Sequence, residues 1–345
     1  MTLRHFKNSA ARWPGLFALL LILSCVSSET AANREYVNAT PAYDFENYEF
    51  DATRPLADRV GPLPPHVIDY VRTLDERPDY QSYTPTAAEL ALIRRSLERL
   101  PPRLKRNLQN RGLGIYFIEN FLTSAMTDWS VRRADGQIFS YMIFEARSLR
   151  QSMQALLNYR ENTCFREDGS GIKTEINLGG AAARENAFTY LLFHEATHAL
   201  DYSERISPYV ESTVAEYQAP LPRDVRTGAL LDRIWQEYRA PRAAFDFPLR
   251  DRVTFYGFRK GPLLDRAQAP ELYAGLARSP FLSLYGTQMW PEDLAELVSM
   301  YYLTRGAGNS YSIRLTRNGR TLNQYKPLEF PEVRKRLEGL DALFR

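Results

Sequence analysis

The sequence has few cysteines, few histidines and no strong excess of one charge. Its 345 residues include two cysteines and four histidines, and the formal net charge is +3. Cys25 lies in or beside an N-terminal apolar run, so we expect Cys164 to be unpaired and exclude a fold held together by disulfides. The sequence has no basic block with interleaved aromatic residues, and it therefore gives no support for nucleic acid binding. With 44% hydrophobic residues, the chain can bury a core of one large or two small domains.

Long hydrophobic runs are missing except near the N-terminus. Arg4, Lys7 and Arg12 precede an apolar run over residues 16–26 that is too short to cross a bilayer, and small residues follow it. This pattern predicts a signal peptide over residues 1–28 and an exported protein, periplasmic, in the cell envelope or extracellular, without a transmembrane helix. The segment before Cys25 loosely resembles a lipoprotein box, so a lipid anchor at Cys25 and free release are both open.

The remaining chain divides into three parts. Residues 29–85 are rich in proline and tyrosine and predict an extended arm; residues 86–305 predict a packed domain with an insertion over 205–284; residues 306–345 predict a hairpin and a helix. Within them, spacing and turn residues predict helices over 67–74, 87–100, 149–159, 225–238 and 331–343, strands over 115–118, 137–145 and 173–178, and a hairpin turn at Asn318-Gly319.

The segment from Tyr190 to Tyr202 carries the most specific motif. On one helix, His194 and His198 leave the same face one turn apart, as two ligands of one Zn²⁺ would. Glu195 is too far round the helix to bind the same ion, but it can hold a water as a general base. The neighbouring residues are apolar, which predicts a buried helix. The alternative is a buried helix with two incidental histidines.

A catalytic zinc site also needs a third protein ligand and an open position for water. We expect this ligand on a helix that begins at Pro291 and runs through about Leu303, because proline suits the first helical position. Glu296 lies among apolar residues of that helix, and a buried carboxylate needs a partner. We predict that Glu296 binds zinc. An ion pair with an arginine is the alternative, and Glu292, one turn earlier on the same face, is the second choice as ligand.

Other side chains near the motif are weaker candidates. His66 lies in the proline-rich arm. Glu204 could bind the metal only if the chain turned back after the helix, which would need glycine at position 201, and that position is Asp201. Asp201 either orients His198 from behind or is a surface or capping residue. The strand over 173–178 is our candidate for an edge to which an extended peptide could hydrogen-bond, although it could equally be an interior strand.

The two motifs together resemble a known family. His194-Glu195-x-x-His198 with a distant glutamate on a second helix resembles the gluzincin branch of the zincin metallopeptidases. Tyr285 ahead of Pro291-Glu-Asp-Leu-Ala-Glu296 is similar to the second-helix motif of the anthrax lethal factor catalytic domain and its relatives, and the similarity covers about residues 86–305.

The resemblance implies a zincin-like α+β fold, mainly helical, with a small mixed sheet whose edge strand flanks the HExxH helix. It implies His194, His198 and Glu296 as zinc ligands, Glu195 as general base and Tyr285 as the hydroxyl that stabilises the oxyanion. The chain departs from the family in having about ninety residues between the two motifs, and about four more residues between Tyr285 and Glu296 than the family pattern leads us to expect. The alternative hydroxyls are those of Tyr202, Tyr301 and Tyr302.

These observations predict a zinc metalloendopeptidase that acts on protein or peptide substrates. Two alternatives stay open: a non-catalytic binding protein of the cell envelope that kept the zincin scaffold, and a zinc amidase that acts on cell-wall peptides. The natural substrate, the cleavage preference, a propeptide role for residues 29–85 and the oligomeric state do not follow from the sequence.

Overall fold

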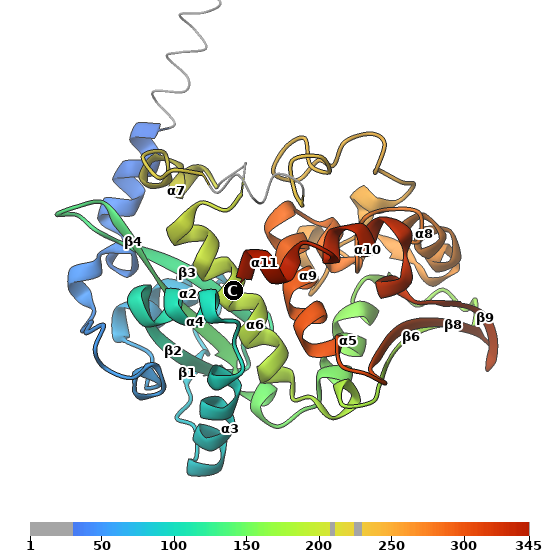
Figure 1. The fold of residues 1–345 in the computed structure, drawn as a ribbon, viewed down its shortest axis with the longest axis horizontal. Helices are drawn as coiled ribbons and strands as arrows, with labels where there is room; N and C mark the ends of the chain where they lie inside the picture. The colour runs from blue at the N-terminus through green and yellow to red at the C-terminus, as the bar shows by residue number, and fades with distance from the viewer. Residues whose placement is uncertain (1–29, 208–210, 224–229, 345) are drawn as a thin grey trace, which may run out of the picture.

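A computed structural model describes residues 30–207, 211–223 and 230–344, and Figure 1 shows their arrangement. The predicted signal peptide and Cys25 lie outside the described residues. Helix α6 (Ala187–Glu204) lies between a four-stranded sheet on one side and helix α9 (Trp290–Thr304) with the C-terminal elements on the other. The fold is a mixed α/β architecture with small sheets. Among the described residues, no helix combines the length and apolar character that crossing a bilayer requires.

The four-stranded sheet has the order β1-β2-β4-β3. Its strands are β1 (Gln81–Ser82), β2 (Gly112–Glu119), β3 (Ala125–Arg132) and β4 (Gln137–Glu145). Strands β2 and β4 are parallel, whereas β1 pairs antiparallel with β2 and β3 antiparallel with β4. The predicted strands over 115–118 and 137–145 are confirmed as parts of β2 and β4.

Both faces of this sheet are buried. Ile115 and Phe117 pack with α6 and with helices α3 (Ala87–Glu98) and α4 (Pro102–Arg111), whereas Tyr116 and Ile118 pack with residues of the arm, including Val67 of α2 (Pro65–Leu74). Successive strand residues point to opposite faces, so an uninterrupted apolar strand needs a cover on each side. The arm supplies that second cover.

The strand predicted over 173–178 is β6 (Ile172–Gly179), but it belongs to another sheet, with the order β6-β8-β9. Strands β8 (Ser310–Arg317) and β9 (Arg320–Tyr325) form the predicted hairpin, in which Asn318 and Gly319 have positive φ. On the outer side of β6, the side-chain amide of Asn158 in α5 (Met153–Asn162) accepts a hydrogen bond from the Ile176 N–H and donates one to the Ile176 carbonyl. A peptide could not pair with that backbone without displacing the amide.

Two helix predictions differ from the structure. In the described part of the segment over 225–238, residues 230–238 form turns. The predicted final helix is two helices, α10 (Pro331–Leu337) and α11 (Leu340–Phe344), which are separated by Glu338 and Gly339. Glycine in a helix interior costs about 1 kcal/mol relative to alanine, which favours a break there. The helix predicted to start at Pro291 is confirmed as α9.

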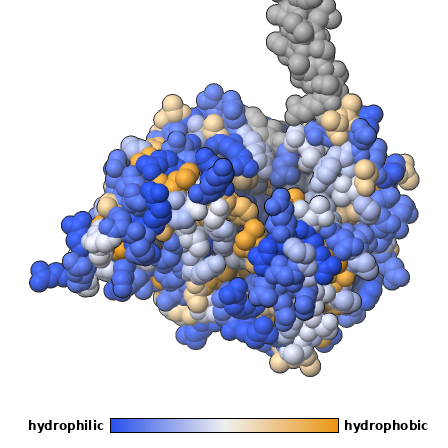
Figure 2. Space-filling view, turned by 180° about the vertical axis from the view of Figure 1, so that it is seen from behind, coloured by the Kyte–Doolittle hydropathy of each residue, from blue (hydrophilic) through white to orange (hydrophobic). Residues whose placement is uncertain are grey.

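Further elements are α7 (Ser212–Gln218), α8 (Ala269–Leu276) and a short parallel pair, β5 (Phe165–Arg166) with β7 (Leu264–Asp265), together with short 3-10 helices. Cys164 is buried and unpaired, as predicted. Figure 2 shows hydrophilic side chains over most of the opposite face of the molecule, with small separate apolar patches.

Candidate metal centre

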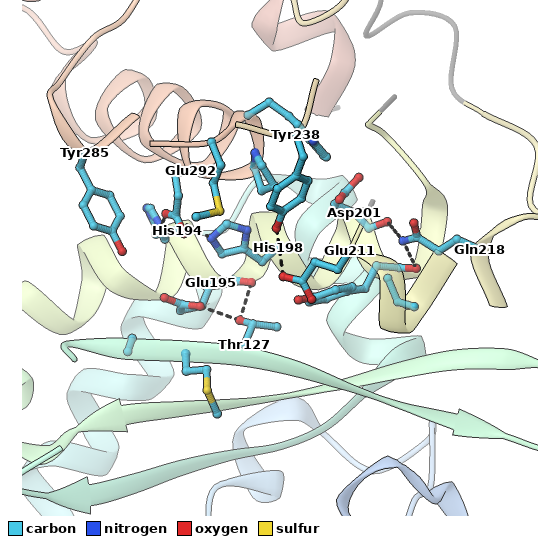
Figure 3. A pocket seen from close by; sticks show the side chains of 17 residues that line it. Thr127, His194, Glu195, His198, Asp201, Glu211, Gln218, Tyr238, Tyr285 and Glu292 are labelled. Carbon is cyan, nitrogen blue, oxygen red and sulfur yellow. Dashed lines mark hydrogen bonds and ion pairs between the residues drawn. The ribbon is translucent and has the colours of Figure 1, made fainter. Parts of the chain in front are cut away.

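Helix α6 presents both histidines of the motif to one cavity. The Asn186 side chain caps the helix by accepting a hydrogen bond from the Phe188 N–H. The His194 and His198 rings lie 4.9 Å apart between centroids, and His194 is only 3% exposed. The cavity beside them has a volume of about 170 Å³ and lies between α6, strand β3 and the start of α9 (Figure 3). The predicted one-face arrangement of the two imidazoles is therefore present.

The third side chain at the imidazoles is Glu292, in the first turn of α9. Its Oε2 lies 2.9 Å from His194 Nε2 and 3.6 Å from His198 Nε2. One ligand atom from each of the three residues lies within 4.8 Å of the others. Tetrahedral zinc with bonds of about 2.0–2.1 Å to nitrogen and oxygen separates its ligand atoms by about 3.3–3.4 Å. The observed separations of 2.9 and 3.6 Å lie on either side of that value, so this donor set fits one Zn²⁺ ion after small side-chain shifts.

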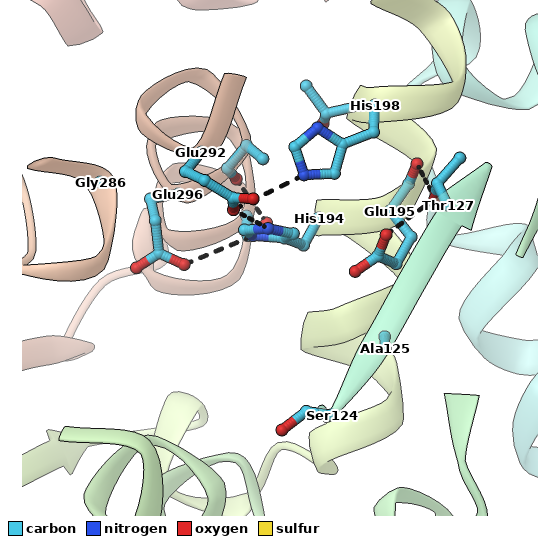
Figure 4. A network of polar contacts seen from close by, with 12 residues as sticks. Ser124, Ala125, Thr127, His194, Glu195, His198, Gly286, Glu292 and Glu296 are labelled. Atoms are coloured by element: carbon cyan, nitrogen blue, oxygen red, sulfur yellow. Dashed lines mark hydrogen bonds and ion pairs between the residues drawn. The ribbon is translucent and has the colours of Figure 1, made fainter. Parts of the chain in front are cut away.

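The structure places Glu296 in a different role from the predicted one. Its carboxylate accepts hydrogen bonds from the Arg160 guanidinium at 3.2 and 2.9 Å, from Ser283 Oγ at 2.7 Å, and from the Tyr190 hydroxyl. Its Oε1 also lies 3.4 Å from His194 Nδ1, on the side of the ring away from Glu292 (Figure 4). The geometry therefore favours Glu292 as the ligand and leaves Glu296 behind His194, where it can orient the ring.

A buried ion pair fixes the start of α9. Asp293 is 1% exposed and accepts hydrogen bonds from the Arg336 guanidinium at 2.8 and 2.7 Å and from Trp235 Nε1 at 2.8 Å. These partners come from the insertion and from α10. Because Asp293 follows Glu292 directly, the same contacts hold the Glu292 backbone beside α6.

The electrostatics of the centre favour a bound cation. Burial opposes protonation of His194, but the hydrogen bond with Glu292 and the Glu296 carboxylate, 3.4 Å from Nδ1, outweigh it and raise the pKa of His194 to about 10. Burial also opposes protonation of His198, but the charge of Glu292, a hydrogen bond with it and the charge of Glu195 together raise the pKa of His198. Burial opposes ionisation of Glu296, yet Arg160 and His194 lower its pKa to about 2. The carboxylates of Glu292 and Glu296 thus create a negative site. It stabilises protons on the two imidazoles, and it would stabilise a divalent metal ion in place of those protons.

Glu195 lies beside the imidazoles and is held from the sheet. Thr127 Oγ1, on β3, donates to Glu195 Oε2 at 2.7 Å and lies 3.0 Å from the Glu195 carbonyl oxygen. Burial raises the pKa of Glu195. A carboxylate with a raised pKa and a fixed orientation is suited to accept a proton and later release it.

Among the candidate hydroxyls, Tyr285 and Tyr202 line the cavity. The Tyr285 ring lies 5.9 Å from the His194 ring, and the Arg160 guanidinium lies over it at 4.1 Å. Tyr301 and Tyr302 instead pack edge-on against each other and lie under the Arg305 guanidinium. Tyr285 lies beside the imidazoles, and its role in stabilising an oxyanion stays a prediction.

The weaker candidates have other partners. The Asp201 carboxylate accepts hydrogen bonds from the backbone N–H and the hydroxyl of Ser207 at 2.8–2.9 Å, which fits a residue that fixes the chain after α6. Glu204 pairs with Arg103 at 2.6 Å. His66 packs its ring edge-on against Tyr48.

Strand β3 and the position of Thr127 were not predicted from the sequence. The residues Thr127, Trp129 and Val131 alternate with polar ones, which is the period of a strand and could have identified it. The link between Thr127 and Glu195 has no comparable signal, because the two residues are 68 positions apart.

Comparisons with known protein families, curated proteins and solved structures found no relative of this chain. No family model, no curated protein and no solved structure matches the chain.

Proposed function

We propose that the protein is an exported zinc-dependent metallopeptidase that hydrolyses peptide bonds. The observation that carries this proposal is the convergence of His194, His198 and Glu292 from two helices, with Glu195 beside them. A structural zinc site would be closed by a fourth protein ligand, whereas three ligands beside a cavity leave a position for water.

The altered ligand assignment improves the resemblance to gluzincins. With Glu292 in place of Glu296, the ligand lies seven residues after Tyr285, and the excess of about four residues noted above disappears. The zincin-like fold belongs to this proposal too: β3 is the edge strand of the four-stranded sheet and lies along the cavity beside α6.

Strand β3 takes the substrate-binding role that the sequence suggested for residues 173–178. Ala125, Met126 and Thr127 line the cavity. Within the described residues, the outer edge of β3 is bridged at Val131, by Asp44 of the arm, which is the end far from Ala125. An extended peptide could therefore add to the near half of β3 through backbone hydrogen bonds.

The chemistry assigned to the chain's own residues follows from their positions. A bound zinc ion would lower the pKa of a water molecule and polarise the substrate carbonyl. Glu195, held by Thr127, takes the proton of the attacking water and passes it to the leaving amine. The Tyr285 hydroxyl donates a hydrogen bond to the carbonyl oxygen as negative charge develops on it. Glu296, ionised by its pairing with Arg160, keeps the His194 ring in orientation.

Substitution of Glu195 by glutamine tests the proposal. The amide keeps the shape of the side chain but cannot accept the proton, so we expect stoichiometric zinc by metal analysis and a loss of about 100- to 10,000-fold in the cleavage rate of a peptide library. Wild-type digestion with and without chelator is the control. Cleavage by Glu195→Gln at the wild-type rate, or a wild-type protein that takes up no zinc, would refute the proposal.

A further inference from the structure

A second cavity lies at the C-terminal end of α6 and shares no lining residue with the metal cavity. Its volume is about 720 Å³, which is within the range of small-molecule sites. One face of α4, the β3–β4 hairpin, the end of α6 and α11 form most of its wall. The polar lining residues are Arg103, Arg106, Asn107, Asn110, Arg111, Arg132, Gln137, Ser203 and Glu204.

The lining of this cavity is strongly basic. It contains four arginines and one acid, Glu204, which already binds the Arg103 guanidinium at 3.0 and 2.6 Å. Asp135, outside the lining, pairs with Arg132 at 2.7 Å. Among the described residues, Arg111 forms no ion pair with a carboxylate, so its charge makes this part of the cavity attractive to anions.

Arg111 and Arg132 converge on a single neutral acceptor. Both donate to the side-chain oxygen of Gln137, Arg132 at 2.6 Å. Their guanidinium groups lie 5.2 and 5.1 Å from the centre of the Phe139 ring. Burial, followed by the charge of Arg132, lowers the pKa of Arg111. An anion between the two guanidinium groups would relieve their repulsion.

The same wall of the cavity contains a buried hydrogen-bond acceptor that has no donor. Asn107 is 5% exposed, and its Nδ2 donates to Ser203 Oγ at 2.6 Å. Its Oδ1 is buried without a hydrogen-bond partner. A buried acceptor left unpaired is destabilising, so a ligand that brings a hydroxyl donor to it gains affinity.

We propose that this cavity binds a phosphate monoester that carries a hydroxyl group. The phosphate lies against the Arg111 guanidinium and the Nη1 group of Arg132, since the Nε and Nη2 groups of Arg132 already pair with Asp135, and guanidinium groups form strong hydrogen bonds to phosphate oxygens. The ligand's hydroxyl donates to Asn107 Oδ1. The same chemistry occurs in free organic phosphates and in the headgroups of phosphate-bearing lipids.

Calorimetry on the signal-free protein tests this site without reference to peptide cleavage. Glycerol 3-phosphate should bind more tightly than inorganic phosphate, and glycerol should not bind. Arg111→Gln or Arg132→Gln should each weaken glycerol 3-phosphate binding by about tenfold or more, because a hydrogen bond to a charged group is lost. Arg99→Gln, which removes an arginine that pairs with Glu185 elsewhere on the surface, should leave it unchanged.

Two further arms identify the hydroxyl contact and the source of the phosphate. Asn107→Ala should make glycerol 3-phosphate bind no better than inorganic phosphate, with the fold checked by a thermal melt. Sedimentation with vesicles that contain phosphatidic acid, sensitive to Arg111→Gln, would assign the site to a lipid headgroup; binding of the free ester alone would assign it to a soluble phosphate. The proposal fails if neither probe binds, or if Arg111→Gln and Arg132→Gln bind both probes as wild type does.

Discussion

The division of roles between Glu292 and Glu296 gives the sharpest prediction. Both residues lie on one face of α9, one turn apart, and both approach His194. Glu292→Gln and Glu296→Gln make the same chemical change at the two positions. If Glu292 is the ligand and Glu296 orients His194, the first substitution should act mainly on zinc affinity and the second mainly on stability.

The magnitudes follow from the contacts. A structural zinc site with four ligands contributes about 10–16 kcal/mol, so one ligand is worth roughly 2.5–4 kcal/mol, and Glu292→Gln should weaken zinc binding by about 70- to 1,000-fold. Loss of an outer carboxylate typically costs about 10- to 100-fold in metal affinity, which we expect for Glu296→Gln. That change also leaves the buried Arg160 guanidinium without its carboxylate, and breaking a buried pair costs about 3–5 kcal/mol of folding stability.

Two assays on each variant separate these effects. Competition with a chromophoric chelator measures zinc affinity, and urea unfolding of the metal-free protein measures stability. Glu292→Gln should lower the metal-free stability less than Glu296→Gln does, because His194 and His198 can lose their protons when the carboxylate is removed, whereas Arg160 stays charged. The assignment is refuted if Glu292→Gln binds zinc as wild type does while Glu296→Gln loses it, since the ligand would then be Glu296.

Three further substitutions test other parts of the structure. Thr127→Val removes the hydroxyl that holds Glu195, and we expect zinc to stay bound while kcat/KM falls by about tenfold or more; an unchanged kcat/KM would show that Thr127 does not position the base. Arg160→Met should lower the free energy of unfolding by about 3–5 kcal/mol, because it leaves the Glu296 carboxylate buried without its partner. Adding Glu296→Gln should restore part of this stability, whereas a double variant whose loss equals the sum of the two single losses would argue against the ion pair. Burial raises the pKa of Asp128 to about 7, so folding stability should fall by roughly 4 kcal/mol at most as the pH rises from about 4 to 7. Asp128→Asn should remove this fall when urea unfolding is measured at pH 5 and pH 8. Parallel pH profiles of the wild type and the variant would contradict this prediction.

Much of the local structure was predictable, because its signals lie within a few residues. The His-Glu-x-x-His spacing placed two imidazoles on one helical face, and Pro291 marked the start of α9. The alternating residues of β6 and the Asn318-Gly319 turn also formed as predicted. Each of these features depends on helical or strand periodicity or on a turn residue, which the chain encodes without reference to distant partners.

The choice of the third side chain at the imidazoles depended on the tertiary structure. Glu292 and Glu296 are equivalent by helical spacing, and the apolar neighbours of Glu296 made it the better candidate in the sequence. Arg160 decides between them: it comes from α5, 136 residues away, and pairs with Glu296, which leaves Glu292 for the cavity. No local pattern records which of 44 basic residues will approach a given carboxylate.

The same limit applied to the sheet and to the arm. The sequence identified β6 as a strand, but the packing of α5 covers its edge, and strand order puts β3 beside the cavity instead. The arm over residues 29–85 reads as extended, yet its described residues cover one face of the main sheet because that face is apolar. The sequence by itself determined the motif and the elements with a strong local signal, such as α6, α9 and β6, since these follow from short periodicities. Only the tertiary structure decided that the edge of β3 and the Glu292 carboxylate lie at the cavity, and that the arm covers one face of the sheet. Each of these depends on contacts between residues far apart in sequence.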